Sequence, residues 1–161
     1  SATLSGIYSN STINANRYGG GIIGWNETQT SSVTSLTNVH FSGAVVGSTT
    51  NGFAGLIGDN DADATITTSS NTGSISGDDG ADYVGGLVGD SDAILTITNS
   101  FNSGAISSKG NACCVAGMDP KEIESVDELG FFGNLPVFSA YTEYDRKKLE
   151  TILKKLQLFL Q

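Results

Sequence analysis

The chain has 161 residues, with 21 glycines, 2 prolines and a formal net charge of −9. The segment Ser1–Asn111 holds nine acidic side chains against Arg17 and Lys109, a balance of −7, and this charge disfavours binding to nucleic-acid phosphates or anionic membranes. No apolar run approaches the ~18 residues that a membrane-spanning helix needs, so we expect no nucleic-acid partner and no transmembrane segment.

A glycine-rich motif recurs along the first part of the chain. Its copies are residues 21–25, 54–59 (Ala-Gly-Leu-Ile-Gly-Asp) and 85–90 (Gly-Gly-Leu-Val-Gly-Asp), and residues 113–118 look like a decayed copy. The last glycines of these copies are Gly24, Gly58, Gly89 and Gly117. Their positions give a period of roughly 30 residues, which indicates stacked supersecondary units.

A second signature accompanies each copy, in residues 41–46, 71–76 and 102–107, and we read residues 4–9 as the tail of an incomplete first unit. Alternating β-branched runs at 64–68 and 94–98 have the period of strands. We therefore predict an all-β fold in which residues 1–117 form a parallel β-solenoid (β-helix) of about three to four coils. An antiparallel sandwich of short strands is the competing interpretation. The apolar residues expected to share one core are Leu56, Ile57, Ile66, Leu87, Val88 and Ile97.

The glycine motif, the Thr/Ile strand and the Asn-x-Gly-x-Ile-Ser signature together resemble the GLUG-motif repeat family, over roughly residues 18–118. That family occurs in large secreted surface proteins, including bacterial adhesins and the non-catalytic parts of some immunoglobulin-A-cleaving proteins. The resemblance implies an extracellular stalk or adhesive surface and no catalytic residue. The first copy departs from the family pattern at Trp25, where later copies have Asp, and the last departs at Cys113 and Cys114.

Alternate carboxylates follow two of the glycine motifs. They are Asp59, Asp61 and Asp63 in one unit, and Asp90 and Asp92 at the same place in the next. Alternate carboxylates are typical of calcium loops, but no glutamate stands where a bidentate ligand belongs. We favour plain solvated charge with no cofactor, and keep calcium binding as the alternative.

Hydroxyl residues flank the central apolar residue of each alternating strand, at Ser35 and Thr37, Thr65 and Thr67, and Thr96 and Thr98. With the apolar residue pointing inward, the hydroxyls form two outward rows. Such rows resemble the flat faces of ice-binding solenoids. Outward-facing threonine is also common in β-strands that bind nothing.

The composition changes near residue 112, and residues 118–161 are predicted to form a small α-helical cap or tail. Asp119 and Pro120 have the pattern of a helix start. A second helix, at about 143–160, carries an apolar stripe expected to cap the last coil or to dock on another copy. This stripe consists of Leu149, Ile152, Leu153, Leu156 and Phe159.

A few other residues stand out. Asn10 and Asn26 begin glycosylation sequons, which matter only if a eukaryote secretes the protein. The only histidine, His40, has no matched acid or nucleophile, so we assign it no catalytic role. The adjacent Cys113 and Cys114 are expected to be free and buried, or paired with another chain.

The sequence therefore predicts a non-catalytic extracellular or cell-surface protein with a structural or adhesive function. Its expected partners are other copies of itself or neighbouring surface proteins, in a stalk or filament. The alternatives are a ligand-binding solenoid, for calcium or ice, and the non-catalytic stalk of a larger secreted enzyme.

Overall fold

The chain folds as a parallel β-solenoid of about three turns. The computed structural model describes residues 1–27, 33–48, 52–77, 83–108 and 111–116. Within these ranges every helix or strand assigned is a β-strand, and every strand pairing is parallel. The solenoid prediction is confirmed, and the antiparallel sandwich is wrong.

Four sheets form the walls of the solenoid, and each receives strands from successive coils. Sheet A contains β1 (Ala2–Ser9), β5 (Thr34–Phe41), β9 (Ala64–Thr67), β10 (Ser70–Asn71), β14 (Leu95–Thr98) and β15 (Phe101–Asn102). Sheet B contains β2 (Thr12–Ala15), β6 (Ala44–Gly47), β11 (Ser74–Gly77) and β16 (Ile106–Ser107). Sheet C contains β3 (Gly19–Gly20), β7 (Gly52–Ala54), β12 (Tyr83–Gly85) and β17 (Asn111–Cys113). Sheet D contains β4 (Ile23–Asn26), β8 (Ile57–Asn60) and β13 (Val88–Ser91).

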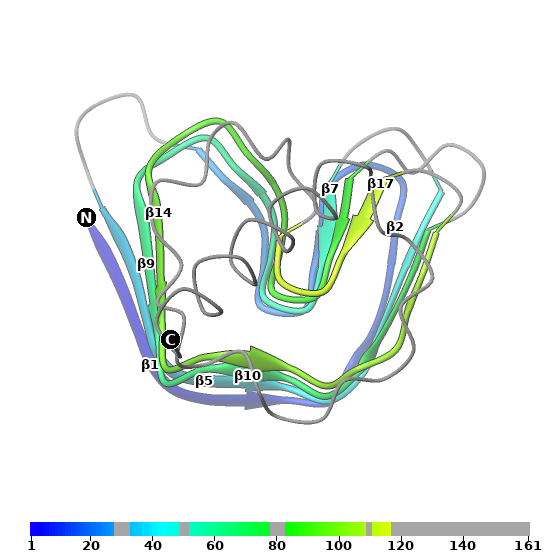
Figure 1. Cartoon of the computed structure of the whole chain (residues 1–161), viewed down its shortest axis with the longest axis horizontal. Helices are drawn as coiled ribbons and strands as arrows, with labels where there is room; N and C mark the ends of the chain where they lie inside the picture. Colours follow the sequence, from blue (N-terminus) through cyan, green and yellow to red (C-terminus); the bar gives the residue numbers. More distant parts are fainter. Residues whose placement is uncertain (28–32, 49–51, 78–82, 109–110, 117–161) are drawn as a thin grey trace, which may run out of the picture.

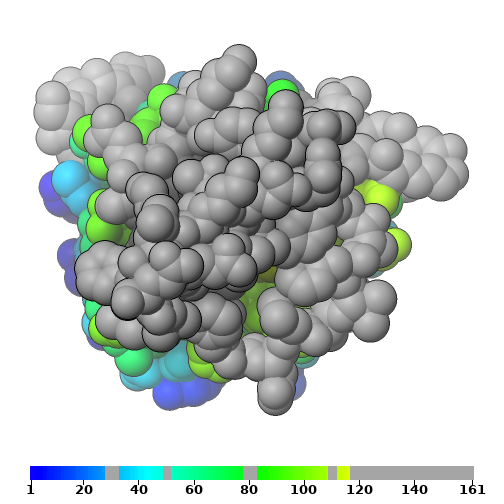
Figure 2. Space-filling view, viewed as in Figure 1, coloured from blue at the N-terminus to red at the C-terminus, as the bar shows by residue number. Residues whose placement is uncertain are grey.

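The view along the stacking direction shows how the walls are arranged (Figure 1). Sheet A forms the left wall, at β9 and β14, and the floor, at β5 and β10, while sheet B rises on the right at β2. Sheet C, at β7 and β17, then dips into the middle of the section. The coils superpose closely, so equivalent residues form columns that run through the solenoid. In the same view, atoms of the first coil are visible at the left and lower edges of the molecule (Figure 2).

The corner between the left wall and the floor is made by one residue per coil in the left-handed conformation. These residues are Gly6, Asn38, Thr68 and Asn99, with φ angles of 66°, 57°, 51° and 49°. Glycine and asparagine adopt this conformation at low cost, whereas a β-branched residue is strained there. Sheet A therefore has two outward faces, which we call the wall face (before the corner) and the floor face (after it).

The recurring glycines let sheets C and D pack backbone against backbone in the inward dip. A Cβ atom on Gly89 would overlap the carbonyl oxygen of Gly58 and the backbone of sheet C. A Cβ atom on Gly86 would collide with the side chain of Asn102 and with the carbonyl oxygen of Cys114. Gly55 meets Asn71 in the same way one coil earlier. The glycine motif and the Asn-x-Gly signature recur together because they contact each other in the core.

The core is a single cluster that runs through the stacked coils. The residues predicted to share it are all buried in it: Leu56, Ile57, Ile66, Leu87, Val88 and Ile97. Leu36 and Phe41 of sheet A and Phe53 of sheet C are also buried and contribute large side chains. Burial on this scale is the main stabilising term of a fold without disulfides in its described part.

The assignment of residues 4–9 to the second signature, as the tail of an incomplete first unit, is wrong. These residues belong to β1, which pairs with β5, so Leu4 is the register partner of Leu36 and Tyr8 that of His40. The second signature of the first coil is instead β2, which pairs with β6. Gly6 therefore serves the corner and is not the equivalent of Gly43, which packs closely against Ser11.

The predicted helical tail, 118–161, lies outside the described residues. So does its apolar stripe of Leu149, Ile152, Leu153, Leu156 and Phe159. In the described ranges, the structure has no helix of the length and hydrophobicity needed to span a membrane.

Candidate functional site

The wall face carries two columns of hydroxyl side chains. One column is Thr3, Ser35, Thr65 and Thr96, and the other is Ser5, Thr37, Thr67 and Thr98. The residues between them, Leu36, Ile66 and Ile97, point into the core as predicted. The first rank, Thr3 and Ser5, was missed because residues 4–9 were misaligned. The Oγ1 atoms of Thr67 and Thr98, which are neighbours in one of these columns, lie 3.2 Å apart.

The floor face carries a column with aromatic character. Its members are Tyr8, His40, Ser70 and Phe101, which are paired in register across the four strands. The rings of Tyr8 and His40 are stacked, with centroids 4.8 Å apart. Tyr8 is 72% exposed and Phe101 is 47% exposed. Ser70, which is small and buried, lies between His40 and Phe101 in this column.

The ring of His40 is held in place from both sides. Its Nδ1 atom shares a hydrogen bond of 2.7 Å with the Oγ atom of Ser70. Its Nε2 atom is 3.0 Å from the Oδ1 atom of Asn38, the corner residue of the same coil. Two hydrogen bonds fix the plane of the imidazole, and that plane supports the exposed Tyr8 ring.

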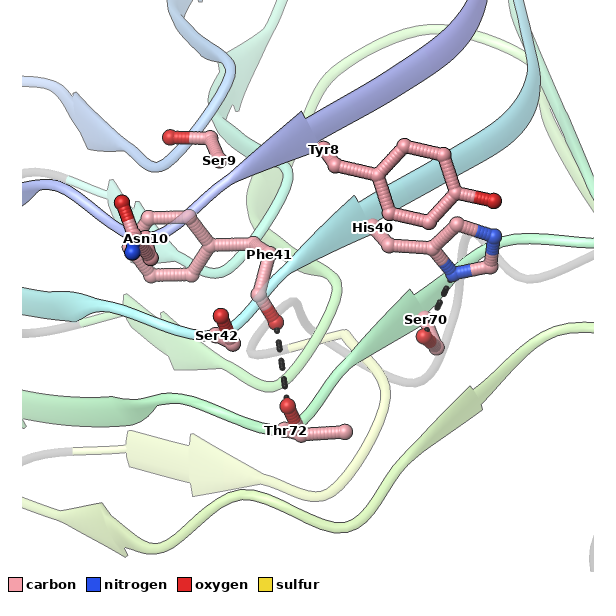
Figure 3. Close-up of a pocket in the computed structure, with 8 residues that line it drawn as sticks. All are labelled: Tyr8, Ser9, Asn10, His40, Phe41, Ser42, Ser70 and Thr72. Atoms are coloured by element: carbon pink, nitrogen blue, oxygen red, sulfur yellow. Dashed lines mark hydrogen bonds between the residues drawn. The ribbon is translucent and has the colours of Figure 1, made fainter.

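A shallow groove of about 450 Å³ lies beside this stack (Figure 3). It is lined by Tyr8, Ser9, Asn10, His40, Phe41, Ser42, Ser70 and Thr72. Figure 3 shows that these residues come from three successive coils, with Tyr8 lying over His40. The hydroxyl of Thr72 donates to the carbonyl oxygen of Phe41 at 3.4 Å. The groove combines an aromatic platform with hydroxyl and amide groups.

The predicted acidic residues lie at the end of sheet D. Asp59 and Asp90 are register partners, and Trp25 occupies the same column in the first coil. Burial raises the pKa of Asp59 to about 7, with smaller contributions from the charges of Asp61, Asp90 and Asp92 and from a hydrogen bond with Asp61. The structure thus brings these four carboxylates near one another, and one of them favours its protonated form.

Two of the other carboxylates are engaged in hydrogen bonds within the protein. The described residues contain no group of three or more His, Cys, Asp and Glu side chains placed to hold a metal ion. Asp61 accepts a hydrogen bond from the indole Nε1 atom of Trp25 at 2.8 Å. Asp63 accepts one from the backbone N–H of Ile94 at 3.2 Å. Calcium binding by Asp59, Asp61, Asp63, Asp90 and Asp92 stays a prediction.

The two predicted sequon asparagines have different environments. Asn26 is 8% exposed, and its Nδ2 atom donates to the Oδ1 atom of Asn60 at 2.6 Å. Asn60 in turn donates to Ser91 at 2.9 Å, so Asn26 belongs to a buried polar ladder across three coils. A glycan on Asn26 would break this ladder. Asn10 is exposed and lies at the groove.

The two cysteines form no disulfide in the described part of the chain, and the expectation that they are buried is wrong. Pairing with another chain stays a prediction. Cys113 and Cys114 are both exposed thiols in the last described coil. Cys113 pairs with Gly85 in sheet C. The chain returns to sheet C here, and Cys113 and Cys114 stand where the previous coil has Gly85 and Gly86. Both cysteine side chains face solvent.

Sequence reasoning missed the groove residues Tyr8 and Thr72, and it treated His40 only as a residue without a catalytic role. Tyr8, His40 and Thr72 are separated by about one coil each along the chain, so a local sequence pattern does not show that they are close in space. No family model, no curated protein and no solved structure matches this chain.

Proposed function

We propose that this chain is a non-catalytic structural or adhesive module that acts outside the cell or at its surface. The observation that carries the proposal is the register of sheet A, which repeats outward side chains in columns across four strands. A rigid surface with repeated polar and aromatic groups suits many weak contacts with an extended partner. The resemblance of the repeats to the GLUG-motif family supports the same assignment.

Self-association is part of this proposal. In the described part of the chain, β2 stands at one end of sheet B and β16 at the other. Strand edges at the end of a solenoid pair with further coils, with a cap or with another chain. Other copies of the chain and neighbouring surface proteins are therefore the proposed partners, in a stalk or filament.

A bead assay tests adhesion directly. Beads coated with the folded protein should aggregate with one another or attach to cell surfaces under flow, whereas beads coated with the heat-unfolded protein at equal density should do so less. Antibodies should label intact cells that make the protein. If folded and unfolded coatings behave alike, or if labelling requires permeabilised cells, the proposal is wrong.

Binding to ice is a second candidate, because the wall face has four ranks of paired hydroxyls in place of the three read from sequence. Such an array repeats at ~4.8 Å between coils. Thr67 lies inside the array, so Thr67→Tyr should abolish inhibition of ice recrystallisation. Thr72→Tyr, on the floor face, is the matched control and should leave it intact. Equal activity of the wild type and Thr67→Tyr would remove this candidate.

A further inference from the structure

The groove on the floor face is shallow and open to solvent. Its volume of about 450 Å³ lies in the lower part of the range of ~300–1,000 Å³ that is usual for small-ligand sites. Its residues are contributed by consecutive coils, so the solenoid itself sets their spacing. The groove is therefore formed without any movement of the described chain.

The aromatic platform is exposed and also rigid. Tyr8 presents a ring that is 72% exposed, and His40, fixed by Ser70 and Asn38, supports this ring from below. An aromatic side chain has few rotatable bonds, and stacking removes much of the freedom that remains. A ligand that lies on Tyr8 would therefore meet a preorganised surface at a low entropic cost.

A row of small polar side chains runs beside the platform. Asn10, Ser42 and Thr72 occupy the position two residues after the aromatic column, and all three are exposed. Hydroxyl and amide groups both donate and accept hydrogen bonds. This row matches a ligand with several hydroxyl groups at its edge.

The charge of the groove narrows the class of ligand. None of its eight lining residues is Asp, Glu, Lys or Arg. The chain as a whole carries −9, which repels anions. A neutral ligand with an apolar face and hydroxylated edges satisfies both the platform and the polar row, and a sugar ring has this combination.

We propose that the groove binds neutral carbohydrate, with one sugar ring stacked on Tyr8 and hydroxyl groups of the polysaccharide bonded to Asn10, Ser42 and Thr72. This inference rests on the proposed adhesive function and names its ligand class. The column continues through Ser70 to Phe101, so a second ring of the same polysaccharide would lie along the floor face.

Affinity electrophoresis of the full chain, made in bacteria so that Asn10 carries no glycan, tests the proposal. The probes are gels that contain neutral β-glucan, mannan or galactan, with alginate as an anionic probe. At least one neutral polysaccharide should retard the wild type, and Tyr8→Ala should lower the affinity roughly tenfold. Tyr8→Phe keeps the ring and should keep the retardation. Tyr18→Ala removes an aromatic residue outside the groove and should have no effect.

Three results would overturn the carbohydrate proposal. They are the absence of retardation by all three neutral probes, retardation by alginate alone, and retardation of Tyr8→Ala equal to that of the wild type. Circular dichroism of each variant excludes loss of folding as the cause. Beads that adhere without any polysaccharide binding would leave the adhesive function standing and reject only the groove as its site.

Discussion

The replacement of Thr68 by Asn should stabilise the solenoid. Thr68 makes the corner of the third coil with a φ angle of 51°, while the other three corners use Gly6, Asn38 and Asn99. A β-branched side chain is strained in the left-handed region, whereas Asn tolerates it. Thr68 is exposed, and its backbone N–H donates to the carbonyl oxygen of Thr98 in either variant.

The expected size of the effect follows from the conformational cost. The left-handed conformation costs an ordinary L-residue roughly 1–2 kcal/mol, and Asn recovers part of this cost. Thr68→Asn should therefore raise the free energy of unfolding by about 1 kcal/mol. The reverse exchange, Asn99→Thr, places the same strain at the same point of the next coil. It should lower the free energy of unfolding by a similar amount.

Urea denaturation followed by circular dichroism measures both variants. The midpoint should rise for Thr68→Asn and fall for Asn99→Thr, with unchanged slopes. Thr68→Ala is the control for loss of the side chain alone, and it should give a smaller gain than Asn. If both exchanges shift the midpoint in the same direction, corner strain does not explain the choice of residues.

Three further predictions concern burial and exposure. Since the pKa of Asp59 is about 7 when folded and 3.8 in the unfolded reference, the melting temperature should fall as the pH rises from about 4 to about 7. Asp59→Asn should flatten this dependence, whereas Glu27→Gln, at an exposed carboxylate that does not contribute to the pKa of Asp59, should retain it; parallel curves for all three proteins would contradict the assignment. Leu87→Ala should lower the free energy of unfolding by about 2–5 kcal/mol, because the side chain is fully buried. The matched control Ile94→Ala, at a residue that is 58% exposed, should cost much less, and equal losses would refute the proposed core. Cys113 and Cys114 should both react with a thiol reagent in the folded protein, Cys114 more slowly because burial raises the pKa of its thiol; protection of either until denaturation would show that it is buried.

The solenoid and its core were predictable because two local signals agree. The period-two runs at 64–67 and 95–98 define strands with inward Ile66 and Ile97, and the glycine motif repeats at a nearly constant interval. The hydroxyl columns followed from the same runs. These features depend on neighbouring residues, which is the range over which sequence patterns are informative.

The first coil was misread because glycine serves two purposes that look the same in a sequence. Gly6 has a positive φ at a corner, while Gly43 allows close approach of Ser11. Both follow a serine, so residues 4–9 resembled the second signature. The structure distinguishes them by strand pairing, which no short pattern records.

The groove was not predictable for a different reason. Tyr8, His40 and Ser70 differ in type and come from successive coils, so they form no motif in the sequence. Only their pairing in register brings them into one column. Likewise, the spacing of Asp59 and Asp61 indicated a cluster of carboxylates but not the burial that raises the pKa of Asp59.

Both the wall face and the groove depend on the in-register stacking of outward side chains. Spin labels attached to cysteines in place of Ser35, Thr65 and Thr96 test it directly, in a chain whose Cys113 and Cys114 are replaced by Ser. Labels stacked at ~4.8 Å should give an electron paramagnetic resonance spectrum dominated by spin exchange. A spectrum equal to the sum of the three singly labelled proteins would show that these residues do not form a column.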